Sequence, residues 1–323
     1  MINTEKLKLY LIDNMVWIIV IGVFIFFSII RPRTFLTFQN IHFIFYVSSM
    51  IGFLVFAEAI CLISGNFDLS VGQIAGFSAM VTAVMIIKTG IPGYFGILLI
   101  ILIGGCCGAF NGFLVGKIHL NPFLVTLGTY LMFDWLTMVV RRGSVLSLPA
   151  VYLAPGGSCI FGIYIAIFIL LGGAFILSII LSKIRWGSNI YSIGGNIEAA
   201  RRCGINVDNV IFSVFTVAGM LSGISGLLYT GYMGVATSNL ADGTVFMAFA
   251  GAVIGGVSLS GGRGSILNTL GGTLLLGVIE AGLTMMAIDP AWQGTFTGAL
   301  VIIAILINQT RKVLRDRVLM PEK

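Results

Sequence analysis

Residues 187–208 read GSNIYSIGGNIEAARRCGINVD and form a polar stretch between long apolar segments. Its centre, 197–203, consists mainly of good helix formers. Asn196 is placed to cap a helix there, because its side-chain oxygen can accept a hydrogen bond from a backbone amide. Gly204 can end the same helix in a left-handed conformation. The stretch therefore predicts a short helix that needs a surface to dock on, because such a helix is unstable alone.

The glycines before this helix predict a hinge. Gly194 and Gly195 stand directly before the capping residue. Two consecutive glycines at such a position indicate that at least one has a positive φ, which is costly for residues with a Cβ atom. We therefore expect the chain to turn sharply here.

The composition of the 323-residue chain is typical of membrane proteins. Hydrophobic residues make up 58% and charged residues 9%, and the mean hydropathy is +1.07, whereas soluble domains carry about 25% charged residues. The 42 glycines suit close helix packing in lipid. We attribute the net charge of +6 to basic residues at the cytoplasmic ends of spans. The five cysteines show no metal-ligand or disulfide spacing.

Apolar runs of about 20 residues predict about ten membrane-spanning helices. The predicted spans are 15–30, 41–63, 69–87, 94–116, 123–140, 160–181, 210–231, 245–259, 266–286 and 292–307. The eighth is short and glycine-rich, so we expect it to be broken or re-entrant. The predicted fold class is an all-α integral membrane protein in which residues 1–323 form a single transmembrane domain.

Charge decides which side of the membrane each loop faces. Ten spans put both termini on one side, together with the central loop, 183–209, and the tail, 308–323. The opposite side then keeps Arg31, Arg33, Lys88, Arg141 and Arg142. Most of the 18 basic residues therefore lie with the central loop. Basic residues concentrate in cytoplasmic loops, so we expect the termini and the central loop to be cytoplasmic.

A second polar stretch, SGNFDLSVG at 64–72, joins the second and third predicted spans. Free backbone groups at this depth are tolerated only when they are buried in protein or line water. Asp68 and Ser70 are predicted to cap the third span, because side-chain oxygens there accept amide protons. The alternative role for Asp68 is to line or gate a solute path.

These stretches resemble the permease subunits of ABC importers, most closely the branch that moves ribose and related monosaccharides. The residues that match the Glu-Ala-Ala coupling loop of that family are Gly194, Gly195, Asn196, Glu198, Ala199, Ala200, Arg201 and Gly204. The segment DLSVG at 68–72 is similar to the hallmark of the sugar branch. NPFLVTLGT at 121–129 and GGVSLSGGRG at 255–264 are similar to two further family motifs, so the resemblance covers nearly the whole chain.

The resemblance implies a function and partners. The short helix would seat in a separate ATP-binding subunit, which would hold ATP and magnesium, and this chain would need no cofactor. A periplasmic binding protein would deliver a small sugar or sugar-like solute to a path through the bacterial inner membrane. A second permease copy, identical or a paralogue, would complete the path, since two-fold symmetry is the commonest closed arrangement. The remaining partner is the lipid bilayer, and no nucleic acid is expected.

Polar and aromatic residues in or near the spans are candidates for lining the path. These are Glu58, Asn66, Asp68, Ser70, Asn111, Phe123 and Thr126. Ionisable groups inside a membrane are costly and therefore functional candidates by default, and Asp134 and Glu280 join Glu58 in this class. Pairing across helices is an equally good explanation for each. Asp134 lies where the family commonly has a basic residue, which leaves the identity of the sugar open.

Motifs of catalysis are missing from the sequence. His42 and His119 do not form an H-E-x-x-H pattern, and no G-x-x-x-x-G-K-[ST] motif occurs, so this chain does not hold ATP in a P-loop. A membrane enzyme is disfavoured for the same reason. The main alternative is a secondary, ion-coupled transporter, which would place acidic groups within broken helices in matched halves. The sequence therefore predicts a transport subunit and not an enzyme.

Overall fold

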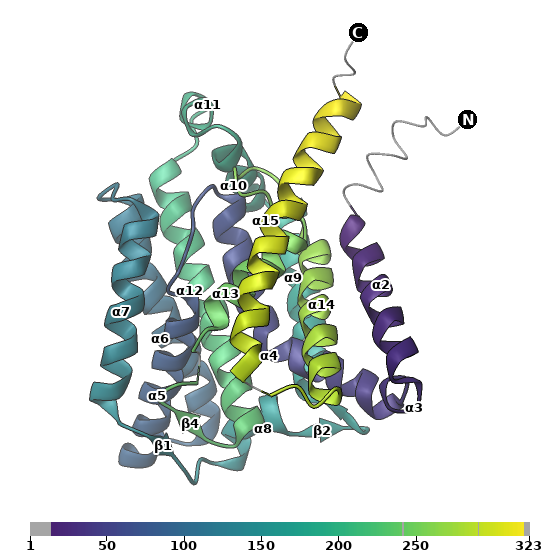
Figure 1. The fold of residues 1–323 in the computed structure, drawn as a ribbon. Helices are drawn as coiled ribbons and strands as arrows, with labels where there is room; N and C mark the ends of the chain where they lie inside the picture. Colours follow the sequence, from purple (N-terminus) through teal and green to yellow (C-terminus); the bar gives the residue numbers. More distant parts are fainter. Residues whose placement is uncertain (1–13, 241, 290, 320–323) are drawn as a thin grey trace.

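The chain folds into a bundle of long helices. The structure is a computed structural model that describes residues 14–240, 242–289 and 291–319. Short helices α10 and α11 lie at one end of the bundle, together with the last turns of α15 (Figure 1). Strands β1 and β4 lie at the opposite end (Figure 1). The bundle thus has two distinct ends, as a protein that crosses a membrane requires.

Seven helices in the described part of the chain are long and apolar enough to cross a membrane. They are α4 (Phe38–Ile63), α5 (Val71–Thr89), α6 (Gly93–Gly116), α7 (Pro122–Val140), α9 (Ile165–Lys183), α12 (Val207–Met233) and α14 (Ile266–Met285). The other three predicted spans fall on α2 (Met15–Ile30), α13 (Thr244–Ile254) and α15 (Ala291–Leu319), whose apolar segments are shorter. The chain is therefore a multi-pass membrane protein, but the prediction of about ten spans is confirmed only in part.

Short elements complete the described structure. The helices are α3 (Pro32–Phe35), α8 (Ala150–Gly157), α10 (Arg185–Gly195) and α11 (Ile197–Arg202). Strand β1 (Ser144–Val145) pairs antiparallel with β4 (Ala236–Thr237), and β2 (Cys159–Ile160) pairs antiparallel with β3 (Ile163–Tyr164). Apart from these two-residue strands, the regular structure of the described residues is helical, which supports the predicted all-α class. Helix α15 continues to Leu319, so most of the predicted tail is helical, and residues 320–323 lie outside the described residues.

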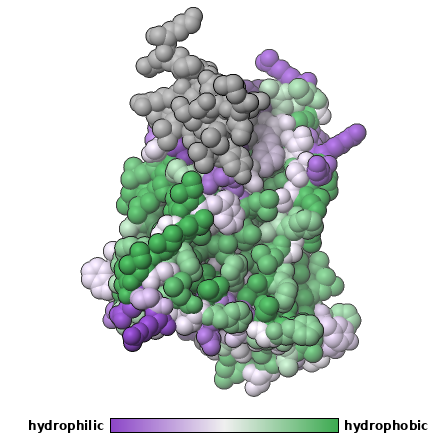
Figure 2. All heavy atoms as spheres, turned by 90° about the vertical axis from the view of Figure 1, so that its right-hand side faces the viewer, coloured by the Kyte–Doolittle hydropathy of each residue, from purple (hydrophilic) through white to green (hydrophobic). Residues whose placement is uncertain are grey.

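Helix α4 forms the centre of the bundle. It packs against α9, α12, α13 and α14, and all its side chains from Tyr46 to Ile63 are buried. The outer helices expose large apolar side chains instead. A broad hydrophobic band covers the face turned toward the viewer in Figure 2, with hydrophilic patches toward its two ends. That distribution suits a bundle surrounded by lipid.

Glycines bring α6 and α12 into close contact. A Cβ atom at Gly108 would overlap the carbonyl oxygen of Phe215, and one at Gly104 would overlap that of Gly219. Small residues let helix backbones approach where lipid provides no hydrophobic driving force between helices. The predicted role of the glycines in helix packing is therefore confirmed at this contact.

Candidate functional site

Helix α11 forms where the central polar stretch predicts it. The Asn196 side chain accepts a hydrogen bond from the backbone amide of Ala199, with 3.0 Å between the nitrogen and oxygen atoms. Gly204 has a φ of 80° and follows the helix in the left-handed region. The predicted cap and the predicted end residue are both confirmed, because each depends only on local backbone chemistry.

One face of α11 is exposed at the end of the bundle. Ile197, Glu198 and Ala199 are exposed, whereas Ala200 is buried against the rest of the chain. The Glu198 carboxylate makes no hydrogen bond or ion pair with any residue that the structure describes. The helix therefore presents a free negative charge beside an apolar side chain.

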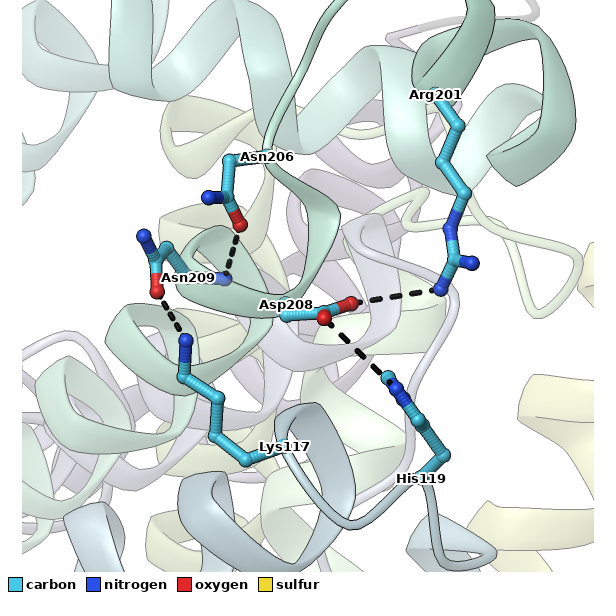
Figure 3. A network of polar contacts seen from close by, with 6 residues as sticks. All are labelled: Lys117, His119, Arg201, Asn206, Asp208 and Asn209. Carbon is cyan, nitrogen blue, oxygen red and sulfur yellow. Dashed lines mark hydrogen bonds and ion pairs between the residues drawn. The ribbon is translucent and has the colours of Figure 1, made fainter.

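A polar network holds α11 against its neighbours (Figure 3). The Arg201 guanidinium lies 3.4 Å from one carboxylate oxygen of Asp208, at the start of α12. His119 Nε2 lies 3.8 Å from the other oxygen. Lys117, after the end of α6, donates a hydrogen bond to the Asn209 side chain. Arg201 is therefore engaged within the chain, which the sequence motif alone did not indicate.

The predicted hinge at Gly194 and Gly195 is wrong. Neither glycine has a positive φ, and both belong to the last turn of α10. Gly194 is needed for a different reason, because a Cβ atom there would overlap the carbonyl oxygen of Ile63. A Cβ atom at Gly195 would meet nothing within 4 Å. The chain changes direction at Asn196, whose backbone is extended with a φ of −162°.

The second polar stretch forms a turn between α4 and α5, here called the buried turn (residues 64–70). One Asp68 carboxylate oxygen accepts hydrogen bonds from the Ser70 amide at 2.8 Å and from the Ser70 hydroxyl at 2.6 Å. The Asn111 side-chain amide on α6 donates to the same hydroxyl at 2.7 Å. The predicted cap from Ser70 is wrong, because its side chain makes no capping bond, whereas Asp68 accepts the Ser70 amide at the start of α5 as predicted.

Several acceptor atoms around the buried turn have no partner in the described structure. They are Oδ2 of Asp68, Oδ1 of Asn111 and both carboxylate oxygens of Glu58, and all three side chains are fully buried. The Asp68 backbone amide approaches the Glu58 carboxylate without meeting the geometry of a hydrogen bond. Burial raises the pKa of the Asp68 carboxyl to about 6, although the hydrogen bonds from Ser70 lower it. A buried acceptor left unpaired costs free energy. This cluster is therefore suited to groups that donate hydrogen bonds.

Aromatic and hydroxyl side chains enclose the same turn. Phe67 packs on Phe123 of α7 with 6.1 Å between ring centroids, and on Phe249 of α13 at 5.0 Å. The Thr126 hydroxyl donates to the Pro122 carbonyl of its own helix at 2.8 Å and lies 3.4 Å from the Phe67 carbonyl. The Asn66 side chain donates to the Ser64 hydroxyl at 2.8 Å. Phe249 was not among the predicted residues, since nothing local in the sequence distinguishes it from other apolar residues of its helix.

The seven candidate path residues thus lie on or around one turn. Asn66, Asp68 and Ser70 belong to it, and Asn111, Phe123 and Thr126 contact it. The Glu58 carboxyl is close enough to Asp68 for the two to interact electrostatically. The structure therefore brings the candidates together, although the sequence did not predict that they meet.

The sequence matches one family over residues 40–305, described as "Branched-chain amino acid transport system / permease component". The chain belongs to this permease family. The D-allose transport system permease protein AlsC of Escherichia coli (strain K12) is 34% identical over 88% of this chain and 87% of its own. The fructose import permease protein FrcC of Rhizobium meliloti is 30% identical over 82% and 76%. The ribose import permease protein RbsC of Bacillus subtilis (strain 168) is 32% identical over 80% and 81%. No solved structure matches the chain.

The two remaining ionisable candidates of the permease lie elsewhere. Asp134 on α7 is half-buried and interacts electrostatically with Asp242, which lies in the segment between β4 and α13. Burial raises the pKa of Asp242 and nearby Asp134 raises it further, whereas a hydrogen bond with Gln73 lowers it. Glu280 on α14 is exposed. Of the three acidic residues predicted inside spans, only Glu58 is fully buried.

Proposed function

We propose that this permease is the transmembrane subunit of an ATP-driven importer for a small sugar or sugar-like solute. Its relatives are transport or import permeases for allose, fructose and ribose, and each match covers most of both chains. ATP is hydrolysed on a separate ATP-binding subunit, because this sequence carries no P-loop motif. A periplasmic binding protein delivers the solute.

The observation that carries this proposal is the exposed face of α11. A helix of six residues is unstable in isolation, yet here a cap and the Arg201–Asp208 pair hold it at the end of the bundle. Its unpaired Glu198 and exposed Ile197 offer a partner a charge and an apolar contact. We assign this face to the ATP-binding subunit, which moves α11 during its cycle.

The residues around the buried turn suit the solute path. A sugar presents hydroxyl groups, and each hydroxyl donates one hydrogen bond. The unpaired oxygens of Glu58, Asp68 and Asn111 are all acceptors. They become accessible to a hydroxyl only if the turn moves, because all three side chains are buried in this conformation. The path therefore opens when the turn is displaced.

The complex contains two permease subunits. One chain carries one α11, whereas the ATPase works as a pair, so two copies or a copy and a paralogue frame the path. The complex lies in the bacterial inner membrane. Both termini and α11 face the cytoplasm, since basic residues favour that side.

Uptake by proteoliposomes tests the proposal. The permease is reconstituted with its ATP-binding subunit, with MgATP inside and the binding protein outside. The probes are radiolabelled D-allose, D-fructose, D-galactose and D-ribose. We expect uptake of at least one sugar that needs ATP and the binding protein and is unaffected by ionophores. Uptake without ATP that ionophores abolish would instead identify a secondary transporter.

A further inference from the structure

Three segments far apart in the sequence meet through bare backbone beside α11. They contribute Gly65 from the buried turn, Gly194 from the end of α10, and Gly261 and Gly262 from the turn before α14. We call this contact the glycine junction. Gly65, Gly261 and Gly262 have φ values of 82°, 78° and 70°, which residues with a Cβ atom rarely adopt.

The glycine junction leaves no room for a side chain. A Cβ atom at Gly194 would overlap the Ile63 carbonyl oxygen and lie 2.5 Å from the Gly262 nitrogen. One at Gly261 would lie 2.6 Å from the Gly194 oxygen. The Gly262 amide also donates a hydrogen bond to the Ile63 carbonyl at 2.8 Å. The obstructing atoms are backbone, so no side-chain rotation relieves them.

The junction lies between the two parts of the candidate site. On one side, only Gly195 and Asn196 separate Gly194 from α11. On the other side, Gly65 precedes Asp68 within the buried turn, and the carbonyl of Ile63 ends α4. The Tyr191 hydroxyl of α10 adds a hydrogen bond to the Gly264 carbonyl at 2.9 Å. Closely packed interiors transmit displacement because they are hard to compress.

We propose that the glycine junction transmits the movement of α11 to the buried turn, with Gly194 as the positioning residue at its centre. Displacement of α10 by the ATP-binding subunit shifts the Ile63 carbonyl and the turn that holds Asp68. This inference rests on the proposed function, because the ATP-binding subunit supplies the movement. It goes further in assigning the link between ATP and the path to backbone contacts.

Hydrogen exchange measured by mass spectrometry tests this link in the reconstituted complex. Exchange is followed in peptides that cover α11 and the buried turn, with MgADP and with a non-hydrolysable ATP analogue. The variant is Gly194→Ala, and the matched control is Gly195→Ala, where the added methyl group meets nothing within 4 Å. Protection of α11 from exchange shows that the ATP-binding subunit has docked. A difference in exchange of the buried turn between the two nucleotides shows that the movement of α11 reaches the turn.

In the wild type and Gly195→Ala we expect nucleotide to change exchange in the buried turn. In Gly194→Ala we expect α11 to remain protected by the ATP-binding subunit, while the response of the buried turn is lost. Hydrolysis stimulated by the loaded binding protein should fall by about tenfold or more in Gly194→Ala. An unchanged response of the buried turn in Gly194→Ala would show that the junction is only an anchor and would overturn the inference.

If Gly194→Ala does not reach the membrane, a milder variant tests transmission through the glycine junction. Tyr191→Phe removes the hydrogen bond that ties α10 to Gly264, two residues after the junction. Its control is Tyr94→Phe, because Tyr94 is exposed and its hydroxyl has no hydrogen bond with the described residues. The response of the buried turn should shrink only in Tyr191→Phe, and an equal response in both variants would refute transmission. A wild-type α11 that gains no protection from the ATP-binding subunit would refute the proposed function itself.

Discussion

The buried turn and α11 are two polar regions that treat a carboxylate in opposite ways. In the buried turn, Asp68 is fully enclosed, and one of its oxygens already accepts two hydrogen bonds from Ser70. On α11, Glu198 is exposed and makes no contact of this kind with the described residues. Burial makes the first carboxylate expensive to leave without partners. Because Glu198 is exposed, its charge costs the isolated chain little free energy and is available to a partner.

This difference in burial gives Asp68 a role within the chain and Glu198 a role in docking a partner. A substitution at Asp68 should disturb the chain itself, because the donors that it satisfies are buried with it. A substitution at Glu198 should leave the chain intact and change only what binds to it.

The largest loss is expected for Asp68→Ala. The Ser70 amide and hydroxyl would lose their acceptor, and each buried donor left without one costs about 1–3 kcal/mol. Sugar uptake in proteoliposomes should therefore fall by more than about tenfold at equal protein content.

The matched control is Asp68→Asn. Its amide oxygen can accept the same two hydrogen bonds, but an NH2 group replaces the unpaired Oδ2, so we expect uptake between that of the Ala variant and that of the wild type. If the Asn variant failed as badly as the Ala variant, the charge or the second acceptor oxygen of Asp68, and not its hydrogen bonds with Ser70, would be the essential property.

The next largest effect is expected for Glu198→Lys, which should weaken only the binding of the ATP-binding subunit. Reversing a charge at a docked surface costs several kcal/mol when a complementary charge faces it. We expect normal membrane abundance and an unchanged melting temperature of the isolated permease, but loss of co-purification with the ATP-binding subunit. Lys88→Glu is the control, because Lys88 is also exposed but lies on α5. Equal recovery of the subunit by both variants would remove Glu198 from the docking surface.

Local features of the molecule could be predicted from the sequence. The Asn196 cap, the position of Gly204 and the extent of α11 follow from neighbouring residues, so they were predictable. The spans were predictable from apolar runs, although three fall on shorter apolar helices. Each of these features depends on residues within a few turns of one another.

The contacts that organise the site are non-local and were not predictable. Nothing in the sequence indicates that the backbones of Gly194 and Gly262 meet, and the glycine pair at 194–195 predicts a hinge that the structure does not have. The cap predicted from Ser70 is wrong because its hydroxyl bonds to the side chains of Asp68 and Asn111 and not to a helix amide. Polar residues in the sequence identify a candidate site, but only the packed structure shows with which atoms their side chains form hydrogen bonds.

A smaller effect is expected for Arg201→Ala. The pair with Asp208 is half-exposed, and such pairs contribute under about 1 kcal/mol. The melting temperature should therefore hardly change, while uptake should fall by about twofold because α11 loses a link to α12. The control is Arg202→Ala, an exposed neighbour without an ion pair among the described residues. A large drop in melting temperature would place Arg201 among the structural residues.

The smallest effect is expected for Gly195→Val. The glycine pair predicts a strained backbone, and valine would then be among the worst replacements. The structure gives Gly195 an ordinary helical backbone, an exposed position and 4 Å of open space around a Cβ atom. Valine costs only a few tenths of a kcal/mol more than a good helix former, and glycine is itself a poor one. Gly195→Val should therefore keep ATP hydrolysis stimulated by the loaded binding protein within about twofold of the wild type. If that stimulation were lost while the complex still assembled, Gly195 would belong to the surface that the ATP-binding subunit contacts, and the free face of α11 would extend back into α10.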